Sequence, residues 1–324
     1  TNELTVRSNK ITMLAKNIRP LPNLKEKDGE VFNAFTDKES RYRYRHLDLI
    51  ANPSRKIIFK QRSDIIYSIR TYLNENEFIE VETPILQPLY GGATARPFKT
   101  FHNSLERDLF LRIADELYLK RLVIGGYEKV YEIAKNFRNE GVDKSHNPEF
   151  TMCEFYQAYS DVYDMLDFTE NMIRYISDFL GIVSVKFNSH EICLKKKFAQ
   201  ISFVDELNKA LGAKFLNLNK SELIAVAKNR DIVLDDSLSY GKIVDKLFSE
   251  LIEEKLIQPT FVLDYPKSIS PLAKQKRGCS EDIVERFELF IGGIEFANSF
   301  TELNDPVEQR LRLKDIIKAT NKID

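Results

Sequence analysis

A short polar loop in the first half of the chain carries residue types that can bind charged ligands. The string FRNE at residues 137–140 is followed, after a short gap, by HNPEF at residues 146–150. Together the two strings supply an arginine, an acid, a histidine and an aromatic ring, which suits a ligand with both anionic and cationic groups. Because the combined string is long and chemically varied, it is far more specific than a lone glycine-rich motif.

The segments on either side of this loop predict the two strands of a hairpin. Residues 130–134 and 151–156 are short and place β-branched and aromatic residues in rough alternation. Alternation puts Phe150, Glu154 and Tyr156 on one face of the second strand, where the arginine of the first strand can face the same cavity. The alternative is a solvated hairpin with charges at its tip, but the specificity of the string favours a binding site.

A second hairpin is predicted near the end of the chain, where two strand-like segments within residues 285–302 flank a pair of glycines. If Ile291 pairs with Ile294, then Glu288 lies diagonally across from Glu295 on one face, within reach of a shared ion. Magnesium prefers oxygen ligands and usually keeps waters and substrate phosphates, so a pair of glutamates fits a metal-bound nucleotide. The alternative is an exposed, solvated acidic pair.

The second strand of this hairpin carries a conflict of its own. Asn298, Phe300 and Glu302 fall on one face, whereas strict alternation puts Glu295 on the other. For all four side chains to line one cavity, the strand needs a bulge or a strong twist near Phe296-Ala297, a feature that is common beside active sites. We therefore predict an irregularity in the ladder at this point.

The composition is that of an ordinary globular protein. The 324 residues are 43% hydrophobic and 30% charged, and a net charge of -1 creates no global field that would attract nucleic acid. Any contact with RNA must therefore come from a local basic surface. Three widely spaced cysteines argue against a disulfide framework or a structural zinc site, and favour a reducing cytoplasm. No apolar run approaches the roughly 20 residues of a membrane span.

Further elements can be predicted from the periodicity of the chain. A helix should run from Pro53 to near Asn76, followed by a strand over residues 78–84 that ends in a proline. A second helix is expected from Glu116 to Ile124, closed by a pair of glycines. Residues 162–256 alternate helical stretches with polar breaks and predict a mostly helical insertion.

These motifs, taken with GGATARPF (residues 91–98), ADEL (114–117), SPLAK (270–274) and EFANSFTELND (295–305), resemble those of class II aminoacyl-tRNA synthetases. Within that class the chain resembles the bacterial-type lysyl-tRNA synthetases, over nearly its whole length and most weakly in the insertion. The resemblance implies an α+β fold with an antiparallel sheet flanked by helices. The implied domains are a remnant of an N-terminal OB-fold with its linker (1–35), a first catalytic part (36–161), the helical insertion (162–256), and a second catalytic part truncated before motif 3 (257–324).

The same resemblance implies roles for particular residues. For ATP it implies Arg138 at the α-phosphate and the substrate carboxylate, Phe150 on the adenine, and further nucleotide contacts from Glu140, His146 and Asn147. For Mg²⁺ it implies Glu288 and Glu295. For L-lysine it implies Gly92, Glu116 and Glu154 around the α-ammonium and Asn298 at the carboxylate. It places Phe300 along the methylenes, and Tyr156 with Glu302 at the ε-ammonium. The implied partners are ATP, L-lysine, tRNA(Lys) and a second copy of the chain, which would dimerise through residues 53–84.

The chemistry of these residue types agrees with that assignment. A substrate with two ammonium groups and one carboxylate needs several acids and one guanidinium in a partly desolvated pocket. Tyr156 and Glu302 stand at the side-chain end without an arginine, so lysine is preferred over aspartate or asparagine. The expected reaction is in-line attack of the lysine carboxylate on the α-phosphorus of ATP, which requires no protein nucleophile and depends on positioning and charge stabilisation.

The chain also departs from the family pattern. It begins at what resembles the last strand and linker of an OB-fold, and it ends before the glycine-rich motif 3 that would carry a second ATP-binding arginine. We therefore expect a fragment of an activating enzyme. One alternative is a non-catalytic paralogue that binds lysine or nucleotide in a regulatory role. A related enzyme that attaches lysine-like groups to a protein is less favoured, because the OB-fold remnant is typical of a tRNA enzyme.

Overall fold

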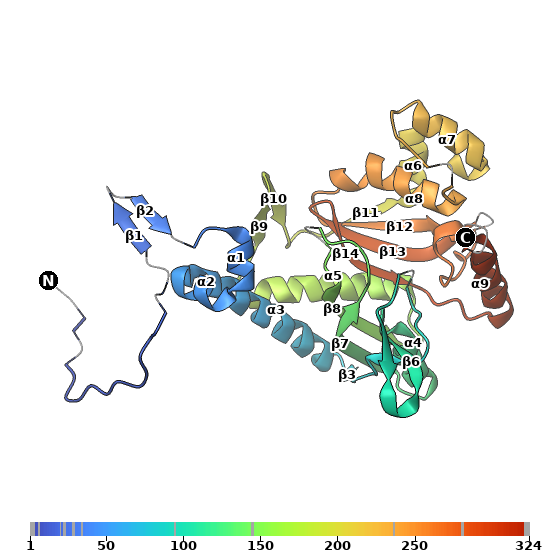
Figure 1. Ribbon diagram of the computed structural model, residues 1–324. Coiled ribbons are helices and arrows are strands. Elements are labelled where there is room, and N and C mark those ends of the chain that lie inside the picture. The colour runs from blue at the N-terminus through green and yellow to red at the C-terminus, as the bar shows by residue number, and fades with distance from the viewer. Residues whose placement is uncertain are drawn as a thin grey trace. The chain divides into compact units, whose positions relative to one another are not determined.

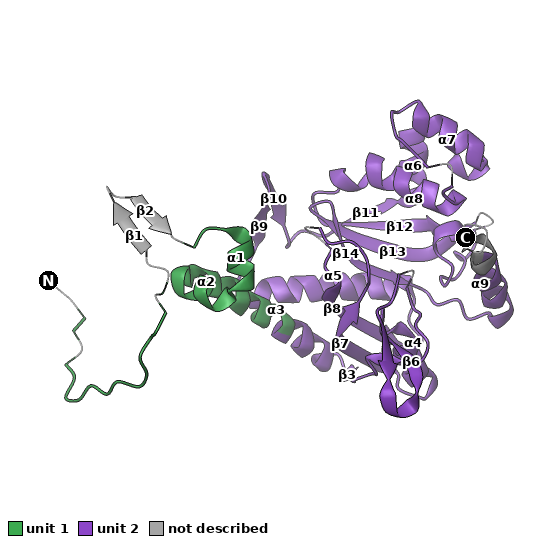
Figure 2. Ribbon diagram, in the orientation of Figure 1, with its two compact units in different colours: residues 1–66 green, residues 67–324 purple. Residues whose placement is uncertain are grey.

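The computed structural model describes residues 4–320 apart from positions 6, 20, 22–23, 28–29, 34, 94, 144–145, 236 and 280–281. The chain divides into two compact units, residues 1–66 and residues 67–324 (Figure 2). The domain boundaries expected from the sequence, after residues 35, 161 and 256, do not coincide with this division and stay predictions.

Unit 1 contains a small hairpin and short helices. Its elements are β1 (Leu24–Lys27), β2 (Glu30–Asn33), α1 (Lys38–Arg43), α2 (Arg45–Ala51), a 3-10 turn (Pro53–Arg55) and the beginning of α3 (Lys56–Glu75). The fully buried Asp48 links the two short helices, because its carboxylate accepts from Arg41 Nε (2.7 Å), Arg45 Nη1 (2.6 Å) and Asn52 Nδ2 (2.9 Å). The helix predicted from Pro53 to near Asn76 is confirmed, since the 3-10 turn at Pro53 leads directly into α3.

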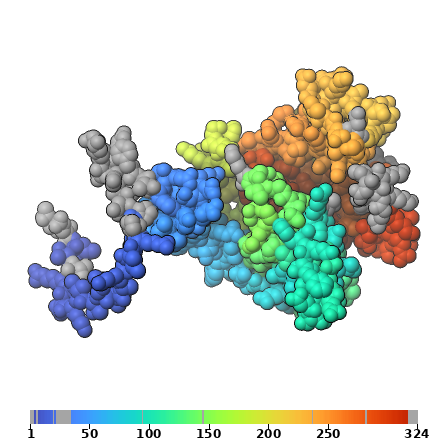
Figure 3. Space-filling model, in the orientation of Figure 1, coloured from blue at the N-terminus to red at the C-terminus, as the bar shows by residue number. Residues whose placement is uncertain are grey.

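Unit 2 holds the hairpin predicted around the polar loop. Strands β7 (Lys129–Phe137) and β8 (Glu149–Gln157) pair antiparallel along their full length, and β3 (Ile79–Glu80) joins β7 in parallel. The strand after α3 is thus present but shorter than the expected residues 78–84. A second small sheet has the order β4 (Leu86–Gln87), β6 (Arg107–Leu111), β5 (Lys99–His102), and the teal residues of β5 and β6 lie at the surface in Figure 3.

The largest sheet of unit 2 has four strands among the described residues. Its order is β11 (Ala199–Ser202), β12 (Thr260–Pro266), β13 (Ile283–Ile291), β14 (Ile294–Phe300), antiparallel except for the parallel pair β11–β12. Helix α5 (Val162–Phe179) packs on one face, and α6 (Phe203–Leu211) and α8 (Tyr240–Leu251) cover the other (Figure 1). The expected α+β class, with antiparallel sheets flanked by helices, is confirmed.

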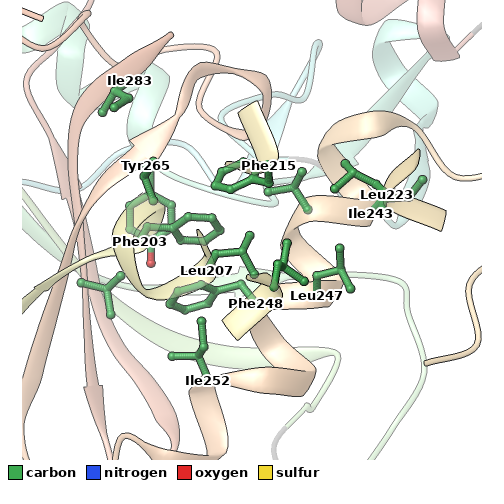
Figure 4. Packing of buried hydrophobic residues seen from close by; sticks show 14 of the residues in the cluster. Phe203, Leu207, Phe215, Leu223, Ile243, Leu247, Phe248, Ile252, Tyr265 and Ile283 are labelled. Atoms are coloured by element: carbon green, nitrogen blue, oxygen red, sulfur yellow. The ribbon is translucent and has the colours of Figure 1, made fainter. Parts of the chain in front are cut away.

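Aromatic packing fixes α6 and α8 to the sheet. The rings of Phe203 and Phe248 stack with centroids 4.0 Å apart, and Phe203 also contacts Tyr265 of β12 at 4.8 Å (Figure 4). Each fully buried ring of this kind contributes about 2–3 kcal/mol of hydrophobic stabilisation. Because Tyr265 belongs both to this core and to the strand beside β13, the core holds the sheet in register where the second predicted hairpin begins.

The predicted insertion, residues 162–256, contains α5, α6, α7 (Lys220–Lys228) and α8, but also three strands among its described residues. Strands β9 (Ser184–Phe187) and β10 (His190–Cys193) form a hairpin, and β11 extends the four-stranded sheet. Each is four residues long, too short for a periodic signal in the sequence. After β14 the chain continues as α9 (Pro306–Thr320). Among the residues the structure describes, no helix combines the length and apolarity that crossing a bilayer requires.

Candidate active site

The hairpin of β13 and β14 contains the irregularity predicted from the sequence. Ile291 pairs with Ile294 and Phe290 with Glu295, but the next pair is Leu289 with Ala297, so Phe296 has no partner in the ladder. This bulge places Glu295 on the same face as the residues that follow it in alternation. That face therefore carries Glu288, Glu295, Asn298 and Phe300 together.

The turn of this hairpin requires its glycines. Gly292 and Gly293 have φ angles of 66° and 73°, in the left-handed region that other residues rarely adopt. A Cβ on Gly292 would also lie 2.9 Å from a ring carbon of Phe187 in β9. The two-residue turn keeps the strands in the register that brings the two glutamates onto one face.

Glu288 is oriented by two neighbours that sequence reasoning did not single out. The Tyr265 hydroxyl donates to Glu288 Oε2 at 2.7 Å, and Arg286 donates one guanidinium nitrogen to the other carboxylate oxygen. The same arginine donates through Nε to Asn298 Oδ1 at 3.1 Å and stacks over the Tyr265 ring at 4.6 Å. Burial, together with the charge of Glu288, raises the pKa of Tyr265 well above its usual range, so the hydroxyl stays a donor. In the sequence, the only sign of this arrangement is that Arg286 precedes Glu288 by two residues, which places both on one face of a strand.

Glu295 connects this hairpin electrostatically with the polar loop. Desolvation by its surroundings and repulsion from Glu288 raise the pKa of Glu295 to about 7, while the positive charges of Arg286 and Arg138 oppose the shift. Glu253 adds further repulsion from the segment after α8. A bound cation would relieve the repulsion between the carboxylates of Glu288 and Glu295.

The donor set at this face suits a magnesium ion only in part. Among the described residues, no group of three or more His, Cys, Asp or Glu side chains is arranged as a protein-only metal cage. Glu288 and Glu295 offer carboxylate oxygens from one strand face, which fits an ion that takes its remaining ligands from phosphates and water.

Arg138 and Phe150 come together at the base of the polar loop. The guanidinium carbon lies 5.1 Å from the centroid of the Phe150 ring, and the Arg138 backbone N–H donates to Pro148 at 2.9 Å. The predicted residues of the loop itself lie farther out on the surface: Glu140, His146 and Asn147 are exposed. His146 Nδ1 contacts Asp143 Oδ2 at 2.8 Å, and the Asn147 side chain donates to the backbone of Glu149. The structure therefore brings the arginine and the aromatic ring together and leaves the other three on an exposed loop.

The beginning of α4 (Glu116–Ile124) lies against Gly92. Gly92 has a φ of 89°, and a Cβ there would lie 3.1 Å from the Cβ atoms of both Ala114 and Glu116. A side chain at this position would be strained and crowded. The expected helix from Glu116 to Ile124 is confirmed.

Behind Glu116 lies a buried pair of acids. Asn136 Nδ2 donates to Asp115 Oδ1 at 2.9 Å, and the Tyr156 hydroxyl donates to Glu154 Oε2 at 3.0 Å. Burial, and then the neighbouring Asp115, raise the pKa of Glu154 to about 9. Glu154 therefore carries a proton at neutral pH.

An ion-pair cluster joins α4 to Glu302, just after β14. Lys120, one turn after Glu116, places its ammonium 2.6 Å from Glu116 Oε1 and 2.8 Å from Glu302 Oε2. The rings of Phe300 and Tyr156 lie beside the same ammonium, at 5.3 and 6.0 Å. Asp115 and Lys120 were not singled out from the sequence, although both stand on or beside the helix that carries Glu116.

Comparison with known proteins agrees with this geometry. The family model of class II tRNA synthetases (D, K and N) matches residues 37–323. Lysine–tRNA ligases from Azobacteroides pseudotrichonymphae and Porphyromonas gingivalis are each 46% identical to the chain, covering 100% and 99% of it and 65% and 56% of their own length. The lysine–tRNA ligase of Staphylococcus epidermidis is 48% identical over 97% of the chain and 62% of its own length.

The chain thus spans between 56% and 65% of the length of these three relatives. Within that span the matched region includes both hairpins, α4 and the arginine of the polar loop. On the family match, the chain belongs to the class II tRNA synthetases (D, K and N).

Proposed function

We propose that the chain carries the amino-acid activation site of a lysine–tRNA ligase. One observation carries the proposal: the Lys120 side chain already lies in the pocket with its ammonium between Glu116 and Glu302 and beside two aromatic rings. The pocket can therefore accept an alkylammonium group of the kind that the substrate side chain presents. The names of the similar ligases support the same substrate.

In the proposed reaction the lysine carboxylate attacks the α-phosphorus of ATP, and pyrophosphate leaves to give lysyl-adenylate. Arg138 would bind the α-phosphate and the substrate carboxylate, so that it stabilises charge as the new bond forms. Phe150, already stacked with Arg138, would carry the adenine. The lysyl group would then pass from the adenylate to a hydroxyl of the terminal adenosine of tRNA(Lys), with AMP as the leaving group. Magnesium bound with ATP would neutralise phosphate charge, with Glu288 and Glu295 as its protein ligands. Further contacts to the nucleotide would come from Glu140, His146 and Asn147.

Selection of lysine would depend on acids at both ends of the substrate. Gly92, Glu116 and Glu154 would surround the α-ammonium, and Asn298, held by Arg286, would contact the carboxylate. Phe300 would line the methylenes, with Tyr156 and Glu302 at the ε-ammonium. An uncharged isostere would leave the Glu302 carboxylate without a partner, which costs roughly a few kcal/mol in a partly desolvated site.

We further propose that the chain dimerises through residues 53–84, within the cytoplasm where its substrates are found. In unit 1 the side chains of Ile57 and Ile58 are 60% and 54% exposed, and in unit 2 Tyr67 and Ile79 are 58% and 49% exposed. Apolar side chains with this much exposure support an interface with a second copy. Analytical ultracentrifugation of the chain and of an Ile58→Glu variant tests this, because the charge should shift the population towards monomer.

The proposed activity is tested by lysine-dependent exchange between ATP and pyrophosphate. Exchange that requires L-lysine and is lost in Glu302→Gln and Arg138→Ala would support a competent activation site. Glu250→Gln, an acid-to-amide change at an exposed position of α8, is the matched control and should exchange like the parent chain. Lysine binding by calorimetry without exchange would instead favour a non-catalytic lysine-binding protein.

A further inference from the structure

Lys120 occupies the position that the proposed function assigns to a ligand. Its ammonium is held by Glu116 at 2.6 Å and by Glu302 at 2.8 Å. The first of these acids belongs to the proposed α-ammonium site and the second to the proposed ε-ammonium site. The rings of Phe300 and Tyr156, which would line the substrate side chain, lie 5.3 and 6.0 Å from the same nitrogen.

The Lys120 ammonium is held as a cation. Its side chain is only 22% exposed, and this burial by itself lowers the pKa of the amine. The charges of Glu116 and Glu302 outweigh the burial, so the pKa of Lys120 is raised above its ordinary value. Conversely, Lys120 opposes the upward shift that burial causes in the pKa of Glu302. The lysine and the two acids thus form one ion-paired group with a net charge of -1.

A substrate ammonium cannot share this place with Lys120. Two like charges held near the same carboxylate oxygens would repel strongly in a partly desolvated pocket. Lys120 is tethered to α4 four residues from Glu116, and its long flexible stem lets the ammonium leave the pocket without unwinding the helix.

We propose that Lys120 is an internal competitor of the substrate, which lysine must displace from Glu116 and Glu302 in order to bind. The inference rests on the proposed function, since it uses the same pocket for L-lysine. Its consequence is that Lys120 offsets one of the two negative charges and occupies both acids, and thereby weakens lysine binding. Lys120 is then a residue that sets the affinity of the site.

The test is the dissociation constant of L-lysine, measured by calorimetry on the full chain and its variants. Lys120→Met removes the cation but keeps a stem of similar length, and should bind L-lysine about tenfold more tightly, as expected for loss of one partly buried competing ion pair. Lys120→Arg keeps a cation at this position and should not gain affinity. Lys209→Met is the matched control, because it removes an exposed lysine of α6 that pairs with Glu206 of the same helix. This variant should bind L-lysine like the parent chain.

A second measurement, the NMR signal of Lys120 in the parent chain, does not require the Lys120→Met variant to fold. The parent chain is labelled with ¹³C at lysine Cε, and the Lys120 signal is identified by its absence from Lys120→Arg. Unlabelled L-lysine should move that signal to the position of exposed lysines. An unmoved signal at saturating L-lysine, or equal or weaker binding by a folded Lys120→Met, would overturn the proposal. If the folded parent chain and all variants fail to bind L-lysine, the proposed function itself fails, and this inference fails with it.

Discussion

Glu295 and Asn298 share one face of the β13–β14 hairpin because Phe296 is left out of the ladder between them. In a regular ladder, side chains at positions 295 and 298 would point to opposite faces. The bulge joins the acidic pair to the strand face that carries Asn298 and Phe300. The two proposed magnesium ligands and part of the proposed amino-acid pocket thus lie on one face because of a single unpaired residue.

The acidic pair should set the magnesium requirement of the site. Replacing Glu295 by Gln removes one of two proposed carboxylate ligands and also the repulsion with Glu288. We expect the Mg²⁺ concentration for half-maximal ATP–pyrophosphate exchange to rise about tenfold, because an amide is a weaker oxygen ligand than a carboxylate. Glu250→Gln should leave the requirement unchanged, and an unchanged requirement in Glu295→Gln would remove this residue from the metal site.

Glu302 should determine the affinity for the substrate ammonium. The Glu302→Gln change keeps the shape of the side chain but removes the charge beside Tyr156 and Phe300. We expect binding of L-lysine to weaken by about 1.5–2 kcal/mol, or roughly 10–30-fold, as for loss of a hydrogen bond to a charged group that is partly exposed. Calorimetry with L-lysine measures the loss, and L-norleucine, which lacks the ammonium, should lose far less. Equal losses for the two ligands would indicate general damage to the pocket.

The stacked rings of α6 and α8 should carry much of the stability of unit 2. Phe248 is 1% exposed and stacks on Phe203, so Phe248→Ala should lower the free energy of unfolding by about 3–5 kcal/mol. Phe296→Ala is the matched control, since the bulged phenylalanine is 61% exposed and its truncation should change stability by less than about 0.5 kcal/mol. Denaturant unfolding followed by circular dichroism gives both values, and similar losses for the two would contradict the packing argument.

Local patterns were enough to predict both hairpins and the bulge. The alternation of residues 151–156 and the glycine pair at 292–293 each specify geometry within a few residues, and the bulge follows from requiring four candidate site residues on one face. The strands β9 to β11 were missed because four residues carry too little periodicity, and β11 is stabilised by its parallel pairing with a strand about sixty residues later in the chain.

The partners of the site residues were harder to predict than the residues themselves. Arg286 and Tyr265 orient Glu288 from two strands, and Tyr265 reaches it only because β12 and β13 lie side by side. Asp115 acts on Glu154 across the space between α4 and β8. Such contacts depend on tertiary packing, for which a single sequence carries no direct signal.

The proton held by Glu154 should make lysine binding depend on pH. Asp115, Glu116 and the Tyr156 hydroxyl act on Glu154, and Glu132 lies directly across from it on β7. Burial followed by Asp115 raises the pKa of Glu154 from 4.5 to about 9. An acid with a raised pKa stabilises the fold fully below its ordinary value, and this contribution is lost as the pH rises through about 9. At pH 7.5 Glu154 is therefore protonated, and an ammonium that binds to it should expel the proton.

We accordingly expect lysine binding at pH 7.5 to release up to one proton, measured by calorimetry in buffers of different ionisation enthalpy. The release should shrink towards zero above pH 9, where Glu154 is already ionised. Asp115→Asn retains an acceptor for Asn136 and offers an amide to Glu154, so the pKa of Glu154 should fall and the release at pH 7.5 should decrease. Release that is the same in Asp115→Asn as in the parent chain would mean that the proton comes from a group other than this pair.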